Sequence, residues 1–438
     1  MRIAKAHFLD PAANGAYGVA ALALSLFVFA YSTIFGQISI LAFYGVWFLL
    51  VAVDYRRALG NPWRYAWVIV FCVFCGLSVF WSLAPSISAR GAVQYATHIL
   101  CAIIAARVCS DRTLTVGVLA GVLVVLLYSF AFGGYHFDAI DGTYSFVGAF
   151  SSKNQLGFFA SLGVFFAWIC IFALPFGLIA KGFALSVGLL SAYALFASQS
   201  ATSIIGAVLT IGVLVALRLI LTLRPSTRRA GFFIALILAI SLGFVAINAG
   251  AIDGILGLFG KDSTLTGRTY LWAEGLAAFR ETPLLGTGYQ AYWVQGFSEA
   301  ERLWAEFFIA SRSGFHFHNT YVEALVELGA IGFLLLVATL LTITIGHLAR
   351  VLNRDNDRSS YILLGLMVLM LVRSFAEVDS LYPYAVGSFL IYFAAGRLSL
   401  VSDAMAPDKN LGRIRIGRRP APAIRSFGWQ EPRRPLVR

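Results

Sequence analysis

Charged residues are scarce in this sequence. Only 12% of its 438 residues are Asp, Glu, Lys or Arg, whereas about a quarter is usual in a soluble domain. Hydrophobic residues make up 59% of the chain, and the mean hydropathy is +0.81. This composition excludes an ordinary soluble domain and predicts a polytopic membrane protein, because a lipid-facing surface carries little charge.

Cysteine is also scarce, and no cleavable leader is expected at the N-terminus. The five cysteines (72, 75, 101, 109 and 170) all fall in or beside apolar runs. Cys72 and Cys75 form a C-x-x-C motif without a thioredoxin-like setting, so we expect them to pack as small residues rather than act in redox chemistry. No A-x-A site follows the apolar run at 17–35, which predicts an uncleaved first helix.

Half of the net positive charge lies in the C-terminal tail. The chain carries +12, and residues 401–438 contribute +6, from Lys409 and eight arginines against three acidic residues. A basic segment after the last apolar run is typical of a cytoplasmic tail near anionic lipids, so no nucleic-acid partner is expected. We therefore divide the chain into a membrane domain, 1–400, and a basic, disordered tail, 401–438.

Twelve apolar runs are long enough, or nearly so, to cross a bilayer, which needs about 20 residues. Each is expected to be a helix rather than a strand, because backbone groups in lipid need internal partners. The sequence thus predicts an all-α integral membrane protein with about 12 transmembrane helices. The predicted spans are 17–35, 38–54, 65–83, 92–109, 113–133, 154–176, 182–198, 202–222, 231–249, 320–346, 360–378 and 384–400.

Positive charge alternates between the connections. Most Arg and Lys residues fall in every second connection, which predicts that these connections and both termini are cytoplasmic. On the other face, one connection of about 70 residues, 250–319, separates spans 9 and 10. Loops of this length tend to be functional. A second, smaller outer loop covers 134–153.

The large outer loop contains an amphipathic stretch at 267–289. Its apolar residues recur at helical spacing, which predicts a helix lying against the membrane surface and ending at Pro283. Arg268 and Arg280 stand at its two ends. They are either solvated side chains or, in the sharper interpretation, arginines that bind a phosphate through the planar guanidinium group.

The same loop ends in two histidines, His316 and His318, just before the tenth span. Thr320-x-x-Glu323 is typical of a capping box and places His318 directly ahead of a helix. If the helix begins earlier, His318 shares one face with Gly329 and Gly332. A zinc site at His-x-His lacks an evident third and fourth ligand, so no metal is expected.

His318 and its neighbours form a pattern that is known from one protein family. The superfamily of O-antigen ligases and polysaccharide polymerases has a motif that resembles His318-Asn319, nine residues, then Gly329-x-x-Gly332. Within this superfamily, the segment Ser152-Lys153-Asn154 most resembles the exopolysaccharide polymerase branch. The similarity extends over about residues 75–335. Its other parts are Trp81-Ser82-x-x-Pro85 with Arg90, Ser152-Lys153-Asn154-x-x-Gly157, and Gly267-Arg268 with Trp272, Pro283 and Gly286-x-Gly288.

One position departs from the family pattern. Ala201 stands where many relatives carry Arg or Lys, so one outer cation is missing. We expect Arg373 to matter more as a result, because an arginine in or at the end of a span is costly and commonly functional. Glu377 lies four residues later and is its expected i,i+4 partner. The alternative is an internal ion pair that only orients helices.

The resemblance implies a glycan transferase of the bacterial inner membrane. Such proteins move a glycan from a polyprenyl-pyrophosphate carrier to a hydroxyl of a glycan acceptor on the periplasmic face, without cofactor or metal. His318 would be the base or would orient the acceptor. Candidates for pyrophosphate binding are Arg90, Lys153, Arg268 and Arg373, and the supporting residues are Asn154, Trp272, Asn319, Gly329 and Glu377.

Several functions remain open at this stage. Polymerisation of lipid-linked repeat units is favoured, with a flippase and a chain-length regulator as expected partners. A ligase would instead hand a finished glycan to lipid A-core or protein, and a rod-shape type peptidoglycan polymerase would use a lipid-linked disaccharide. A secondary transporter should show repeated halves and polar groups at mid-membrane, which this sequence does not show.

Overall fold

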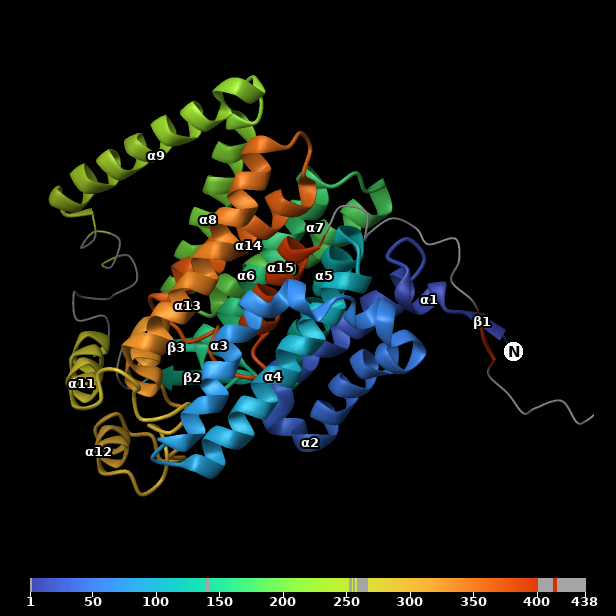
Figure 1. Ribbon diagram of the computed structural model, residues 1–438. Coiled ribbons are helices and arrows are strands. Elements are labelled where there is room, and N and C mark those ends of the chain that lie inside the picture. The colour runs from blue at the N-terminus through green and yellow to red at the C-terminus, as the bar shows by residue number, and fades with distance from the viewer. Residues whose placement is uncertain are drawn as a thin grey trace, which may run out of the picture.

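The computed structural model describes residues 2–138, 142–251, 254, 257, 267–400 and 413–415. Helices dominate this part of the chain, as predicted (Figure 1). The longer helices are α2 (Gly15–Leu59), α3 (Ala66–Leu77), α4 (Pro85–Val108), α5 (Asp111–Phe132), α6 (Lys153–Trp168), α7 (Leu178–Ala197), α8 (Ala201–Ile220), α9 (Pro225–Asn248), α11 (Arg268–Glu281), α13 (Thr320–Asn353), α14 (Arg358–Ser374) and α15 (Val386–Ser399). The shorter ones are α1 (Ala6–Leu9), α12 (Ser298–Glu306), the 3₁₀ helices η1 (Pro62–Tyr65) and η2 (Ser78–Phe80), and the π-helical segment η3 (Ile169–Ala173).

The apolar helices show that the chain is a membrane protein. Within the described residues, nine helices are long and apolar enough to cross a bilayer. They contain the first ten predicted spans, because α2 holds both 17–35 and 38–54 on either side of Gly36, whose φ of +63° interrupts the helix. The last two predicted spans coincide with α14 and α15, which are shorter, at 17 and 14 residues. A total of twelve spans stays a prediction.

Small residues let the helices pack closely. A Cβ added to Gly117 would lie 2.8 Å from the side chain of Leu22, and one added to Gly163 would lie 2.1 Å from Ser191 Oγ. Small residues serve this purpose in membrane bundles because they allow backbones to approach. The five cysteines, all described, are buried and form no disulfide, as the packing interpretation expects.

One helix stands apart from the bundle. None of the residues of α9 is buried, and Figure 1 shows it leaning away from the other helices. Its N-terminal end is held to the end of α13 and the segment after it by hydrogen bonds at 2.7 Å, from Arg229 to Asn353 and from Arg228 to Asp355.

Two pairs of β-strands are present that the all-α prediction did not include. β2 (Gly134–Asp138) and β3 (Thr143–Gly148) form an antiparallel hairpin in the smaller outer loop, which the sequence analysis left without regular structure. β1 (Arg2–Ala4) pairs with β4 (Arg413–Arg415). The rest of the predicted basic tail, 401–412 and 416–438, lies outside the described residues.

The described part of the large loop forms a small second core beside the start of α13. Its centre comprises Leu271, Tyr292, Leu303, Phe317, Val322 and Val326. α11 confirms the predicted helix, and its buried residues Leu271 and Gly275 pack on protein: a Cβ on Gly275 would lie 2.5 Å from Val322. Its position against the membrane surface stays a prediction. In Figure 1, α11 and α12 lie together beside this end of α13. Residues 252, 253, 255, 256 and 258–266 of the loop lie outside the described residues.

Candidate functional site

The start of α13 fixes the position of His318. Asn319 is the N-cap, and its Oδ1 accepts hydrogen bonds from the backbone N–H of Tyr321 (2.9 Å) and Val322 (3.2 Å). His318 therefore stands directly ahead of the helix, as predicted. The predicted capping box is wrong in one respect: Thr320 is the first helical residue, and its hydroxyl donates to the carbonyl of Glu377 (2.7 Å). An amide at the N-cap satisfies the same free N–H groups.

The loop before α13, residues 315–318, is held by hydrogen bonds from α13 and from α11. The N–H of Phe317 donates to Glu323 (2.8 Å), and the carbonyl of Phe317 accepts from the Trp272 indole (2.9 Å). His318 itself has a φ of +52°, a left-handed conformation that costs about 1–3 kcal/mol in a non-glycine residue and is often found at functional sites. Its backbone N–H donates to Nδ1 of His316 (3.0 Å).

Gly329 interrupts α13 eleven residues after His318. Its φ is +64°, and a Cβ there would lie 2.3 Å from the backbone carbon of Leu284. Backbone groups freed by the interruption pair with the 283–288 segment, since Gly288 donates to Glu327 (2.8 Å) and Ala330 to Pro283 (2.8 Å). The loop and α13 are thereby locked in one register below His318.

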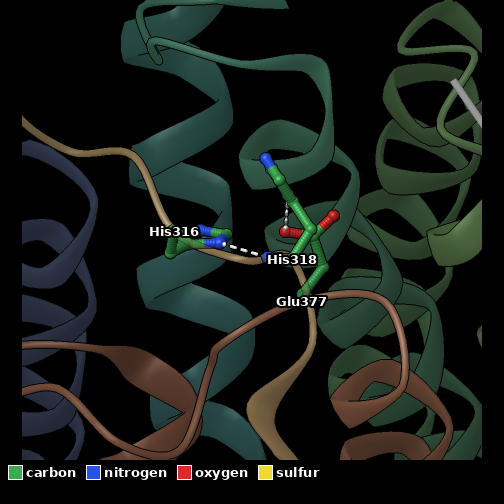
Figure 2. Close-up of side chains that lie close together, drawn as sticks. All are labelled: His316, His318 and Glu377. Carbon is green, nitrogen blue, oxygen red and sulfur yellow. Dashed lines mark hydrogen bonds and ion pairs between the residues drawn. The ribbon is translucent and has the colours of Figure 1, made fainter. Parts of the chain in front are cut away.

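Glu377 joins the pieces of the site. Its Oε1 accepts from Asn154 (2.8 Å) and Arg268 (2.9 Å), and its Oε2 lies 3.5 Å from Nδ1 of His318. Figure 2 shows the His318 and Glu377 side chains turned toward each other, with His316 beside them. The last separation is longer than a good hydrogen bond, and catalytic contacts commonly tighten when substrate binds.

The charge of Glu377 is stabilised by these neighbours. Burial by itself raises the pKa of its carboxyl group, but the close approach of His318 and the positive charge of Arg268 outweigh it. The pKa of Glu377 is therefore well below its ordinary value. A carboxylate in this position favours a proton on Nδ1 of His318 and leaves Nε2 as the acceptor.

Arg373 has a different partner from the one predicted. The backbone N–H of Glu377 donates to the Arg373 carbonyl at 2.8 Å, but α14 ends at Ser374 and the Glu377 side chain turns to Arg268. The Arg373 guanidinium instead contacts Asp379 (2.6 Å) and donates to Ser203 (2.8 Å). Ser203 is two residues after Ala201, so Arg373 lies near the position where the resemblance led us to expect a further cation.

A cavity of about 1230 Å³ collects most of these groups. Lys153, Asn154, His316, His318, Arg373, Glu377 and Asp379 line it. Lys153 contacts Thr143 (2.6 Å) and Asp138 (3.5 Å) of the β-hairpin. Two predicted cations are placed differently: Arg268 reaches the site through Glu377 without lining the cavity, and Arg90 lies exposed on α4, outside the lining.

Comparison with known proteins decides the family. A family model described as O-antigen ligase matches residues 185–337. The exopolysaccharide production protein ExoQ of Rhizobium meliloti (strain 1021) is 53% identical over 436 residues, which cover 99% of each chain. This chain belongs to the O-antigen ligase and polysaccharide polymerase superfamily.

The superfamily match and the cavity overlap only in part. Arg268, Trp272, His318, Asn319 and Gly329 lie inside the matched residues 185–337. Glu377, which lies beside His318, and Asn154, which donates to Glu377, lie outside this range, after α14 and at the start of α6. The folded chain is therefore needed to assemble the site.

A metal ion is a second candidate occupant of the site. Ligand atoms of His316, His318 and Glu377 lie within 4.8 Å of one another, so the third ligand that the sequence did not show is present. Burial lowers the pKa of His316 to about 3, with a further contribution from His318, so His316 is neutral. However, Oε1 of Glu377 already accepts from Arg268 and Asn154, and a guanidinium beside a carboxylate disfavours a second cation.

The sequence analysis missed the carboxylates that neutralise the cavity cations. Asp138 approaches Lys153 and Asp379 approaches Arg373. Asp379 follows Arg373 by six residues, beyond the helical spacing used to search for partners. A wider search for acidic residues around the end of α14 would have found it.

Proposed function

We propose that this chain polymerises polyprenyl-pyrophosphate-linked repeat units into an exopolysaccharide, on the periplasmic face of the bacterial inner membrane. The observation that carries the proposal is the His318–Glu377 contact in a cavity that Lys153 and Arg373 also line. Such a cavity offers a base beside groups that bind phosphate, which is the combination that glycan transfer requires.

In the proposed step, an acceptor hydroxyl oxygen bonds to the anomeric carbon of the donor glycan. The bond from that carbon to the pyrophosphate oxygen breaks, and its electron pair leaves with the polyprenyl pyrophosphate. The hydroxyl proton passes to Nε2 of His318. Glu377 stabilises the resulting imidazolium, as a carboxylate does in other base–carboxylate pairs.

The leaving group needs positive charge. Lys153 and Arg373 would bind the pyrophosphate directly, and a substrate phosphate would compete with Asp138 and Asp379 for them. Arg268 would add to the local potential through its contact with Glu377. We assign Asn154 and Asn319 to positioning, because they hold Glu377 and the start of α13. Arg90 has the weakest case, since it does not line the cavity.

The main alternative is a ligase. The matching family model carries the description O-antigen ligase, whereas the full-length relative is named for exopolysaccharide production. The match to ExoQ covers 99% of both chains, so we favour polymerisation. We further propose metal-independent chemistry, cytoplasmic termini, and cooperation with a flippase and a chain-length regulator.

The test is reconstitution in liposomes with the lipid-linked repeat unit purified from the host. We expect a ladder of lengthening glycans that His318→Ala abolishes. His7→Ala, which changes an exposed histidine on α1, is the matched control and should leave the ladder intact. Transfer that requires added lipid A-core would instead indicate a ligase, and export of the substrate without transfer would indicate a transporter.

A further inference from the structure

The cavity has a second wall that the proposed chemistry does not use. Gln290, Trp293, Glu327 and Tyr382 line this wall, and none of them is a cation. Glu327 lies four residues after Glu323, so the two carboxyl groups share a face of α13. Both residues are buried, at 1% and 0% exposure. The two carboxyl groups differ in how many hydrogen bonds they accept from the protein.

Glu323 is saturated by protein donors. Its Oε1 accepts from the Trp293 indole (3.0 Å) and the Tyr382 hydroxyl (2.5 Å), and its Oε2 accepts from the Phe317 N–H (2.8 Å). Glu323 does not line the cavity. Its role is structural, because it fixes the orientation of two aromatic side chains that do.

Glu327 is not saturated. Its Oε2 accepts from the backbone N–H of Gln290 at 3.0 Å, whereas no described residue donates to its Oε1. Oε1 is not among the fully buried side-chain atoms that lack a partner, so a molecule in the cavity can reach it and donate a hydrogen bond to it. Because Glu327 lines the cavity, a hydroxyl group of a bound molecule can be this donor.

We propose that Glu327, Gln290 and Trp293 form a sugar-binding subsite for a phosphate-free ring of the glycan. This inference rests on the proposed function. A sugar offers hydroxyl donors for Glu327 and an apolar face for an aromatic ring. The Trp293 ring packs against Tyr292, Phe315 and Phe317, at centroid distances of 4.9, 5.1 and 4.8 Å, and its indole N–H donates to Glu323. A site held in advance in this way binds with less ordering cost.

The subsite would set specificity rather than rate. A site that accepts a hydrogen bond from a substrate hydroxyl disfavours a ring that lacks this hydroxyl or presents it elsewhere. The cations Lys153 and Arg373 would recognise the pyrophosphate of any repeat unit. Glu327 would distinguish one repeat unit from another.

The experiment measures two ligands by calorimetry on the full-length protein in detergent. One probe is a phosphate-free oligosaccharide repeat unit released from the host exopolysaccharide, and the other is inorganic pyrophosphate. In Glu327→Gln, the amide oxygen can still accept from Gln290, but an NH₂ group then faces the cavity and cannot accept from a hydroxyl. We expect about tenfold weaker oligosaccharide binding with unchanged pyrophosphate binding.

Two further variants make the result specific. Trp293→Leu should weaken oligosaccharide binding about fivefold without affecting pyrophosphate. Lys153→Gln should give the reverse pattern. Thermal unfolding checks that each variant is folded, and if Glu327→Gln is not, Trp293→Leu decides.

The inference is overturned if folded Glu327→Gln binds the oligosaccharide like the wild type, or if it loses both ligands equally, as a structural role predicts. In either case a wild-type protein that still polymerises lipid-linked repeats keeps its proposed function. A wild-type protein that neither binds pyrophosphate nor polymerises would instead contradict the proposed function itself.

Discussion

Replacing Glu377 by Gln tests how the site is organised. The substitution keeps the size of the side chain and removes its charge. Arg268 and His318 then lose the carboxylate that each approaches, at 2.9 and 3.5 Å. Asn154 keeps a possible acceptor at the same place.

The expected loss can be worked from these contacts. A hydrogen bond or close contact with a charged partner contributes about 1.5–3 kcal/mol. Two such contacts at Glu377 amount to about 3–6 kcal/mol. If they act in the transition state, the rate falls by about two to four powers of ten, because each 1.36 kcal/mol is a factor of ten. Loss of a carboxylate that orients a catalytic histidine is comparable in size.

The assay is the initial rate of glycan extension in proteoliposomes, with thermal unfolding measured in parallel. The matched control is Glu274→Gln, which breaks a carboxylate–arginine pair with Arg302 on the surface of α11 and α12. The control should keep at least half of the wild-type rate, because exposed ion pairs contribute little. A folded Glu377→Gln protein with a rate within threefold of the wild type would refute this account of the site.

Three further predictions concern stability and metal. His316→Asn should reduce the loss of thermal stability between pH 7 and 5, because the unfolded chain binds a proton near pH 6.5 while half-buried His316 stays neutral down to about pH 3. This linkage is worth up to about 1.4 kcal/mol per pH unit, and equal slopes of stability against pH in the two proteins would contradict it. Gly329→Ala should lower the melting temperature or prevent folding, because its φ is +64° and its Cβ would meet Leu284; Gly45→Ala, with nothing within 4 Å of its Cβ, is the control. EDTA should leave the extension rate unchanged, and a loss restored by a divalent ion would assign His316, His318 and Glu377 to a metal.

The parts of the site that depend on a few neighbouring residues could be predicted from the sequence. The polar residues after His318 correctly placed it ahead of a helix, because a cap is a property of a few neighbouring residues, although the cap itself is Asn319. The amphipathic spacing after Arg268 likewise predicted α11. The long apolar runs predicted the helices that the structure contains.

The long-range partners could not be predicted in the same way. Glu377 contacts Arg268 across 109 positions and Asn154 across 223, whereas the i,i+4 rule considers only neighbours on one helix. It therefore paired Glu377 with Arg373. The end of α14 at Ser374 decides the outcome, because beyond it the side chains no longer follow helical spacing.

The residues that line the cavity also could not be predicted from the sequence. The β-hairpin that brings Asp138 to Lys153 alternates aromatic and polar residues over 135–138 and 143–146, a strand signal that the sequence analysis did not use. Arg90 carried the family pattern without reaching the cavity. Motif membership gives the residue type at a position, and the packing of helices decides which of these residues meet.

The most direct test of the central claim is a structure of the His318→Ala protein with the lipid-linked repeat unit bound. The account predicts phosphate oxygens within about 3 Å of Lys153 Nζ and the Arg373 guanidinium, with the anomeric carbon facing the space left by the imidazole. A pyrophosphate bound away from both cations, or an anomeric carbon on the far side of Glu377 from position 318, would contradict it.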